Sequence, residues 1–208
     1  MNLGAYTLLA FSSLFVIVDS VGTIPAFLAM TATNTPEERI RMARLACWVA
    51  AGVLLFFSIT GLAIFKLFGI TMPAFQIAGS FILLLVAHDM LRGRRSTVQE
   101  TAEEKNAGIT KDDIAITPLA VPMLSGPGAI TTAIMMRGKA EGAVYVIALL
   151  LAVCLVCYLS YLTLKLAAHG AKRIGPIPMK ITTRLMGLLL AAVAVQFFLN
   201  ALHVLQQP

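Results

Sequence analysis

The distribution of charged residues constrains this chain more than any single motif does. A first stretch, residues 1–36, contains only one charged residue, Asp19. Five later stretches contain no Asp, Glu, Lys or Arg, namely residues 45–65, 67–88, 114–136, 142–164 and 185–208. A helix that spans a bilayer needs about 20 mostly apolar residues. The pattern therefore predicts an all-α membrane protein with six transmembrane helices, provided that Asp19 is tolerated in the first.

The composition agrees with this class and argues against nucleic-acid binding. The chain is 59% hydrophobic and 12% charged, whereas soluble domains carry about 25% charged residues. The formal net charge of +6 comes from basic residues scattered through short loops, without interleaved aromatic residues,. No basic residue precedes the first apolar stretch, so we expect no cleaved signal peptide. The expected surroundings of the protein are a lipid bilayer.

Local signals set the bounds of the predicted helices. Irregular backbone cannot face lipid, so each apolar stretch should be helical. Thr35 and Glu38 have the spacing of a capping box, with Pro36 at the first helical position, and predict the start of the second helix,. The predicted helices cover residues 4–33, 37–66, 71–91, 114–136, 142–168 and 182–205.

The basic residues are divided unevenly between the two sides that these helices define. The first, third and fifth connections carry 13 of the 16 Lys and Arg residues, which places those connections in the cytoplasm and both termini outside, in the periplasm. The polar segment 92–113 is then a cytoplasmic linker between two three-helix segments, residues 1–91 and 114–208. Because three is odd, the two segments enter the membrane from opposite faces. Two inverted three-helix repeats are typical of secondary transporters.

The first helix of each segment carries helix-breaking residues near its middle. Proline removes a backbone hydrogen bond and clashes with the preceding turn, and glycine has a low helix propensity. We therefore predict that helices one and four are broken at mid-membrane, with new half-helices starting near Thr23 and Gly128, whose partial positive charge attracts a carboxylate. The alternative is a pair of proline kinks that Ser and Thr side chains relieve. The residues concerned are DSVGTIP at 19–25, the prolines at 118 and 122, and SGPGAI at 125–130.

The chain resembles the MarC family of bacterial membrane proteins in three segments, VDSVGTIPAFLAMT, IAGSFILLLVAHDML and ITPLAVPMLSGPGAITTAI. The resemblance covers nearly the whole chain, and its GPGAI motif is quite specific. It implies a multi-pass protein of the bacterial inner membrane. Some relatives transport small neutral amino acids such as glycine or alanine, so the resemblance implies a substrate of this class here.

Asp19 is the only charged residue deep within a predicted helix. An Asp at the centre of a bilayer costs about 2.5–3.5 kcal/mol, so this side chain should face a cavity or a partner. No Lys or Arg lies near the middle of any helix, which favours a small zwitterion, with its ammonium at Asp19 and its carboxylate at the half-helix starts. The alternative role for Asp19 is a structural acceptor that caps the break. The residues expected to bind substrate are Asp19, Ser20, Gly22, Thr23, Pro25, Ser125, Gly126, Pro127, Gly128 and Thr131.

Three further polar residues are candidates for coupling or gating. His88 is a candidate proton relay, because imidazole exchanges protons near neutral pH. The neighbouring Asp89 belongs to the same group, and the alternative for both is a surface ion pair at the interface. Gln196 is a polar residue in the core of the sixth helix. Separately, Ala43, Cys47 and Ala51 form a stripe of small residues, which favours close packing within the bundle or between copies in a homo-oligomer.

The favoured interpretation is a secondary transporter for small neutral amino acids of the glycine and alanine class. It would work by alternating access, with H⁺ or Na⁺ as coupling ion and without a bound cofactor or metal. The alternatives are an exporter of another small metabolite or drug, and a structural membrane protein that does not transport. We do not expect an enzyme, because the sequence contains no HExxH motif, no GxSxG motif and no paired acids within a helix,.

Overall fold

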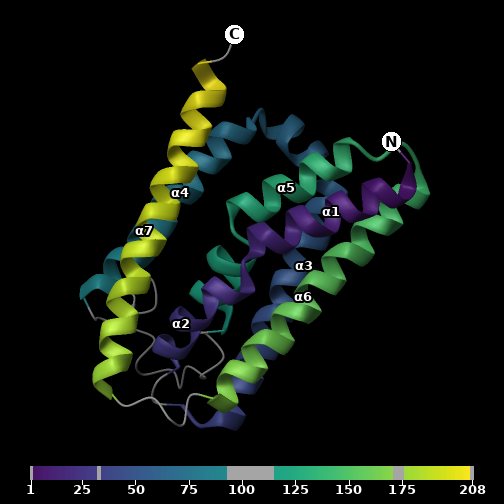
Figure 1. Ribbon diagram of the computed structural model, residues 1–208. Coiled ribbons are helices and arrows are strands. Elements are labelled where there is room, and N and C mark those ends of the chain that lie inside the picture. Colours follow the sequence, from purple (N-terminus) through teal and green to yellow (C-terminus); the bar gives the residue numbers. More distant parts are fainter. Residues whose placement is uncertain (1, 32–33, 93–114, 171–175, 207–208) are drawn as a thin grey trace, which may run out of the picture.

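The computed structural model describes residues 2–31, 34–92, 115–170 and 176–206, and the chain is helical without strands throughout these ranges (Figure 1). The predicted linker, residues 92–113, lies outside the described residues except for its first position. The helices are α1 (Leu3–Val18), α2 (Ser20–Met30), α3 (Pro36–Phe68), α4 (Met72–Arg92), the π-helix η3 (Ala115–Leu124), α5 (Pro127–Gly138), α6 (Ala143–Gly170) and α7 (Pro176–Gln206).

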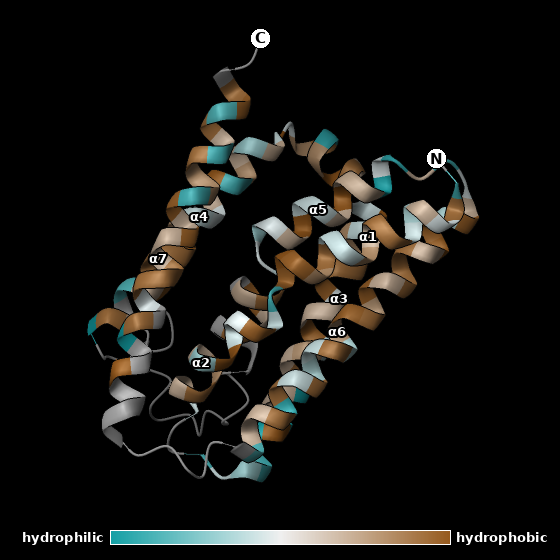
Figure 2. Ribbon diagram, viewed as in Figure 1, coloured by the Kyte–Doolittle hydropathy of each residue, from teal (hydrophilic) through white to brown (hydrophobic). Residues whose placement is uncertain are grey.

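Five helical stretches of the described residues are long and apolar enough to cross a membrane. Hydrophobic residues predominate along these helices (Figure 2), and many large hydrophobic side chains are exposed; Leu67, Leu166 and Trp48 are 80%, 75% and 74% exposed. So much exposed apolar surface is unstable in water and is expected in lipid. The prediction of an all-helical membrane protein is therefore confirmed. The five stretches are Leu3–Met30, Pro36–Phe68, Met72–Arg92, Ala143–His169 and Gly187–Leu205.

The start of α3 confirms the predicted capping box. Thr35 Oγ1 accepts a hydrogen bond from Glu38 N at 3.3 Å, and Glu38 Oε2 accepts one from Thr35 N at 3.1 Å. Pro36 occupies the first helical position, where its missing N–H would have had no partner,. α3 ends at Phe68, and the next residue, Gly69, caps it in a left-handed conformation with φ of 64° that glycine adopts without steric cost,.

Most of the hydrophobic core lies between α1, α3, α5 and α6, which we call the central bundle. Its largest buried side chains include Tyr6 and Leu14 of α1, Leu54 of α3 and Ile134 of α5. Tyr6 also fixes α1 to its neighbours, because its hydroxyl donates to the Met136 carbonyl at 2.9 Å and its ring packs edge-on against a tyrosine of α6. These contacts hold the central bundle together as one unit.

Helices α4 and α7 pack against each other along one side of the central bundle (Figure 1), and we call them the α4–α7 pair. A Cβ added at Gly187 would lie 3.0 Å from the Ala87 carbonyl, so the two backbones approach closely. The rings of Phe81 and Phe198 continue the contact, with centroids 6.1 Å apart. The pair therefore has its own close interface, built from one helix of each half of the chain.

The α4–α7 pair meets the rest of the molecule mainly through α2, η3 and α5. A small separate cluster of buried side chains joins α2 to α4, through Ala26, Val86 and Met90. Further along α4, Pro127 at the start of α5 packs directly on Gly79, where an added Cβ would overlap the proline ring. The seam between the pair and the central bundle is thus formed by the two short helices that follow the predicted breaks.

Candidate functional site

The first break in the chain is a single residue, Asp19, between α1 and α2. Its backbone is left-handed, with φ of 41° and ψ of 60°, and it is the only non-glycine residue with positive φ in the described part of the chain. Asp tolerates this conformation better than most residues because its short side chain can hydrogen-bond locally. The Asp19 carbonyl accepts hydrogen bonds from Thr23 N at 3.0 Å and from Thr23 Oγ1 at 2.9 Å.

The new half-helix begins earlier than predicted. It was expected near Thr23, but α2 begins at Ser20 and continues through Pro25. Inside a helix the ring of a proline clashes with the carbonyl of the residue four positions earlier, which is Val21 for Pro25. Val21 lies in the first turn of α2, and the break at Asp19 leaves this turn free to adjust. Proline is accommodated there without ending the helix.

The Asp19 side chain caps the half-helix that follows it. Oδ1 accepts a hydrogen bond from Gly22 N at 3.0 Å, which is the usual bond of an N-cap. Gly22 must lack a side chain, because an added Cβ would overlap Oδ2 of the same carboxylate. No hydrogen bond to Oδ2 is found within the described residues. The structural role that was left open for Asp19 is therefore present, and it uses one of the two carboxylate oxygens.

Ser20 holds the start of α2 against the central bundle. Its hydroxyl lies 2.6 Å from the hydroxyl of Ser160 on α6, and both side chains are buried. Ser160 also donates to the Val156 carbonyl of its own helix at 2.8 Å. Ser20 is thus occupied in positioning the break.

The second break is built differently, because a widened helix leads into it. Ser125 N and Ser125 Oγ both donate to the Ala120 carbonyl, at 2.8 Å and 2.9 Å, across the five-residue spacing of a π-helix,. The sequence carries prolines at 118 and 122 in this segment, which cannot donate to a regular α-helical ladder,. The chain then turns at Ser125 and Gly126 before α5 begins at Pro127, one residue before the predicted start at Gly128.

The start of α5 has no side-chain cap. Gly126 is the N-cap, with extended φ and ψ of −69° and 173°, and no side chain of the described residues bonds to the helix start. The N–H groups of Gly128 and Ala129 precede the first intrahelical hydrogen bond, which runs from Ile130 N to the Gly126 carbonyl at 2.9 Å,. The partial positive charge of a helix start is therefore uncompensated here.

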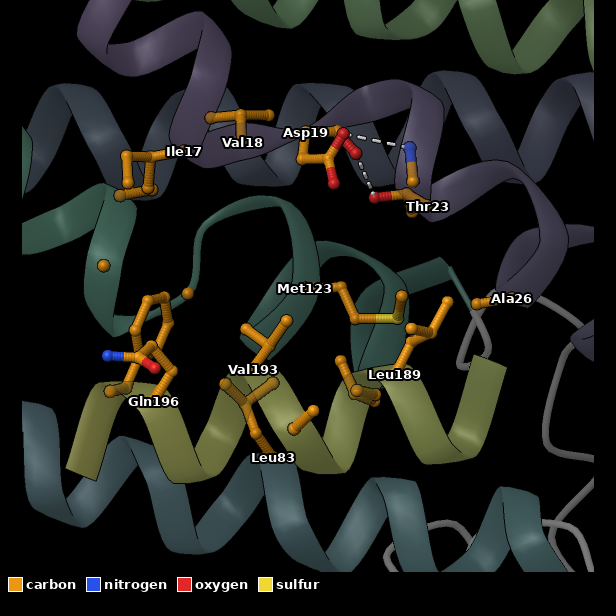
Figure 3. A pocket seen from close by; sticks show the side chains of 17 residues that line it. Ile17, Val18, Asp19, Thr23, Ala26, Leu83, Met123, Leu189, Val193 and Gln196 are labelled. Atoms are coloured by element: carbon orange, nitrogen blue, oxygen red, sulfur yellow. Dashed lines mark hydrogen bonds between the residues drawn. The ribbon is translucent and has the colours of Figure 1, made fainter. Parts of the chain in front are cut away.

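Both breaks open onto one cavity of about 500 Å³ (Figure 3). It lies between the α1–α2 break and the start of α5 on one side and the α4–α7 pair on the other. Its volume is in the range of about 300–1,000 Å³ that is typical of small-molecule sites. Of the described residues that line it, Asp19 is the only charged one. The cavity thus has a carboxylate at one break and uncapped N–H groups at the other.

The predicted substrate-binding residues divide into those at the cavity and those behind it. Asp19, Gly22, Thr23, Gly126 and Gly128 line the cavity. The others do not line the cavity but belong to the turns and helix starts around the two breaks, namely Ser20, Pro25, Ser125, Pro127 and Thr131. Thr131 Oγ1, for example, donates to the Pro127 carbonyl at 2.5 Å.

The candidate coupling residues are not gathered at the cavity. Gln196 lines it and donates to Asn200 Oδ1 on the same helix at 2.7 Å. His88 lies on the exposed surface of α4 and is not a lining residue. The side chain of Asp89 lies outside the described part of the structure. The coupling role of all three stays a prediction.

Sequence reasoning missed the opposite wall of the cavity. Leu83 of α4 and the α7 residues Leu189, Val193 and Phe197 form most of it, and Met123 also lines the cavity from η3. They are apolar residues in apolar helices, so neither their type nor their spacing distinguishes them from neighbours that face lipid. Only the packing of the α4–α7 pair against the two breaks identifies them.

Comparisons with known proteins agree with the helical membrane architecture. Residues 4–205 match the family described as MarC family integral membrane protein. A UPF0056 membrane protein of Methanocaldococcus jannaschii is 39% identical over 198 residues, covering 95% of this chain and 96% of the relative. The UPF0056 membrane protein YvbG of Bacillus subtilis is 34% identical, covering 89% and 88%, and YhcE of Escherichia coli is 28% identical, covering 92% and 89%. No solved structure matches the chain.

Proposed function

Because this chain belongs to the MarC family of integral membrane proteins, we propose that it is a secondary transporter of small neutral amino acids of the glycine and alanine class. In this proposal H⁺ or Na⁺ is the coupling ion, and the protein lies in the inner membrane of a bacterium with both termini in the periplasm. The protein is not an enzyme and needs no cofactor. The substrate is a zwitterion bound in the cavity between the two breaks.

The observation that carries the proposal is the pairing of opposite charges in one cavity. The Asp19 carboxylate can hold an ammonium group, since Oδ2 is not used in capping α2 within the described residues. The uncapped start of α5, at Gly128 and Ala129, can hold a carboxylate,. An anion would be repelled by Asp19, and a simple cation would leave the helix start of α5 unused. An α-amino acid presents both groups.

The packing of the helices also supports two inverted three-helix repeats. α3 packs on α6, and α4 packs on α7, so equivalent helices of the two halves contact each other. α1 and α2 pack on α6, just as η3 and α5 pack on α3. α1 begins and α7 ends at the same end of the molecule (Figure 1), as expected for an even number of crossings. On this proposal η3 and α5 together form the sixth crossing.

This interleaved packing points to the α4–α7 pair as the unit that moves in alternating access. Rocking one half of the chain against the other would have to separate α4 from α7 and α3 from α6. Movement of the α4–α7 pair against the central bundle leaves both interfaces intact and changes only the seam at the cavity. Rigid-body movement of one bundle against another around a fixed site is the usual way that such transporters work.

Crosslinking tests which unit moves. Two double variants are made in a protein without its native cysteines. One carries Ile17→Cys together with Phe197→Cys, across the seam. The other carries Phe81→Cys together with Phe198→Cys, within the α4–α7 pair. Ile17 and Phe197 both approach the position of Gly128, so a short bifunctional thiol reagent can join them. We expect the first crosslink to stop uptake and the second to leave it unchanged, relative to the same variants without reagent. Loss of uptake on linking Phe81 to Phe198 would contradict the proposed movement.

The function itself is tested by uptake of labelled glycine and alanine into proteoliposomes that contain the purified protein. An imposed proton or sodium gradient should drive accumulation, and the gradient that does so identifies the coupling ion. Failure of both amino acids to accumulate under either gradient would refute the proposal. The orientation is tested separately, because a reporter fused at the C-terminus should lie in the periplasm and one near Glu103 in the cytoplasm.

A further inference from the structure

We propose that the α7 side of the cavity selects amino acids with aliphatic side chains, so that affinity rises from glycine through alanine to valine. This inference rests on the proposed function, because it takes the substrate to be an amino acid held between Asp19 and the start of α5. It goes further by assigning the group that distinguishes one amino acid from another. The selecting residues are Leu189 and Val193 of α7.

The charged residue Asp19 and the aliphatic residues Leu189 and Val193 lie on opposite walls of the cavity, which Gln196 also lines from α7. Asp19 and Thr23 lie on one side of the space in Figure 3, and Leu189 and Val193 face them from the other side. Leu83 extends the apolar wall from α4. A ligand that fits both walls has its charged groups at one end and an apolar group at the other. An aliphatic amino acid has this shape, whereas glycine has no group to place on the α7 side.

Leu189 and Val193 form a continuous surface, because residues four apart lie on the same face of a helix,. Neither carries a hydrogen-bonding group in its side chain. A hydroxyl or amide on the ligand would be desolvated there without a partner, which lowers affinity. The wall therefore favours aliphatic over polar side chains of similar size.

The size of the cavity makes this preference measurable. A space of about 500 Å³ leaves room beyond glycine, and water must then occupy the surface beside Val193. Burial of one methylene group contributes about 0.8 kcal/mol, which corresponds to about fourfold in affinity. Valine, with two more carbon atoms than alanine, should therefore bind about 15-fold more tightly.

A matched pair of variants on α7 tests the assignment. Val193 and Val195 lie on the same helix and are 45% and 46% exposed, but only Val193 lines the cavity. Threonine has nearly the shape of valine and adds a hydroxyl. We expect Val193→Thr to lower the affinity for valine about fourfold or more while leaving that for glycine unchanged. Val195→Thr should change neither.

The experiment is titration of the purified protein with glycine, alanine, valine and serine, by calorimetry, in wild type and the two variants. The expected result is rising affinity from glycine to valine, serine no tighter than alanine, and loss of the valine preference only in Val193→Thr. Equal or falling affinity along the series would overturn the selectivity while leaving the proposed function in place. The same holds if Val195→Thr acts like Val193→Thr. Absence of binding by all four amino acids would overturn both.

Discussion

The two breaks of the chain lie at one cavity but satisfy their helix starts in different ways. At the first, Asp19 supplies a carboxylate that accepts a hydrogen bond from Gly22 N. At the second, Gly126 supplies no side chain, and the start of α5 stays uncapped within the described residues. A capped helix start has its positive charge compensated, whereas an uncapped one still attracts an anion. The first break thus provides a negative group to the cavity, and the second provides a positive one.

This difference shows how a broken-helix site can bind a zwitterion without any basic side chain. Two identical uncapped breaks would attract anions from both sides. Two acidic breaks would favour a cation. One break of each kind fits a molecule with both charges, at the cost of a single charged residue in the membrane. The following variants either remove this difference or measure it.

The largest effect is expected when the second break is blocked. An added Cβ at Gly128 would lie 2.7 Å from Phe197 Cζ and 3.3 Å from Ile17 Cγ2, so Gly128→Leu forces a bulky side chain between the helix start and the cavity. We expect uptake in proteoliposomes to fall below detection. Crowding of this kind also lowers the free energy of unfolding by about 1–3 kcal/mol. Gly52→Leu on α3 is the control, because nothing lies within 4 Å of an added Cβ there.

Removal of the charge at the first break should weaken amino acid binding nearly as much as Gly128→Leu does, but it should change the stability of the protein little. Asn is as good an N-cap as Asp and also tolerates a left-handed backbone, so Asp19→Asn should fold with unchanged or slightly raised stability. A hydrogen bond to a charged group contributes about 1.5–3 kcal/mol, so amino acid affinity should fall by about 10-fold to 150-fold. Calorimetry and thermal unfolding measure the two effects.

Asp19→Ala separates the two roles of the side chain. It removes the cap, which contributes about 1 kcal/mol, and places alanine in a left-handed conformation that costs about 1–2 kcal/mol. We expect a clearly lower melting temperature than for Asp19→Asn, with the same loss of binding. Wild-type uptake by Asp19→Asn would show that the carboxylate acts only as a cap.

A smaller effect is expected at Gly22, where the side chain of Asp19 keeps its charge but must change position. An added Cβ overlaps Asp19 Oδ2, so Gly22→Ala should turn the carboxylate away from the cavity and weaken amino acid binding about 10-fold, as for one charged hydrogen bond. Alanine gains up to about 1 kcal/mol of helix propensity, which offsets the loss of the cap. Gly4→Ala near the start of α1 offers the matched control, since it has room for the methyl group and should bind normally.

The smallest effect is expected when the second break is made to resemble the first. Gly126→Ser adds a hydroxyl that can accept a hydrogen bond from the start of α5. This bond should raise the free energy of unfolding by about 0.3 kcal/mol. The same bond competes with the substrate carboxylate. We expect affinity to fall by about 2-fold to 10-fold, the range for a neutral hydrogen bond. Unchanged affinity in a more stable Gly126→Ser protein would show that the substrate carboxylate does not lie at this helix start.

The sequence alone determined the features that depend on local interactions. Charge-free stretches specify membrane helices because lipid excludes charge and unpaired backbone groups. The capping box at Thr35 and Glu38 involves residues three positions apart, and the structure has it as predicted. The two breaks were also located to within a few residues, because proline and glycine act on the turn that contains them. The exact starts at Ser20 and Pro127 differed, since each depends on how the preceding turn adjusts.

The tertiary structure alone decided which groups face the cavity. Whether the Asp19 carboxylate caps α2 depends on its left-handed backbone, which no spacing rule predicts for a single residue. Val193 and Val195 are the same residue type in the same helix, yet only one of them lines the cavity. In a membrane protein an apolar side chain suits lipid and protein equally well, so hydrophobicity carries no information about direction. The packing of the α4–α7 pair against the two breaks supplies that information.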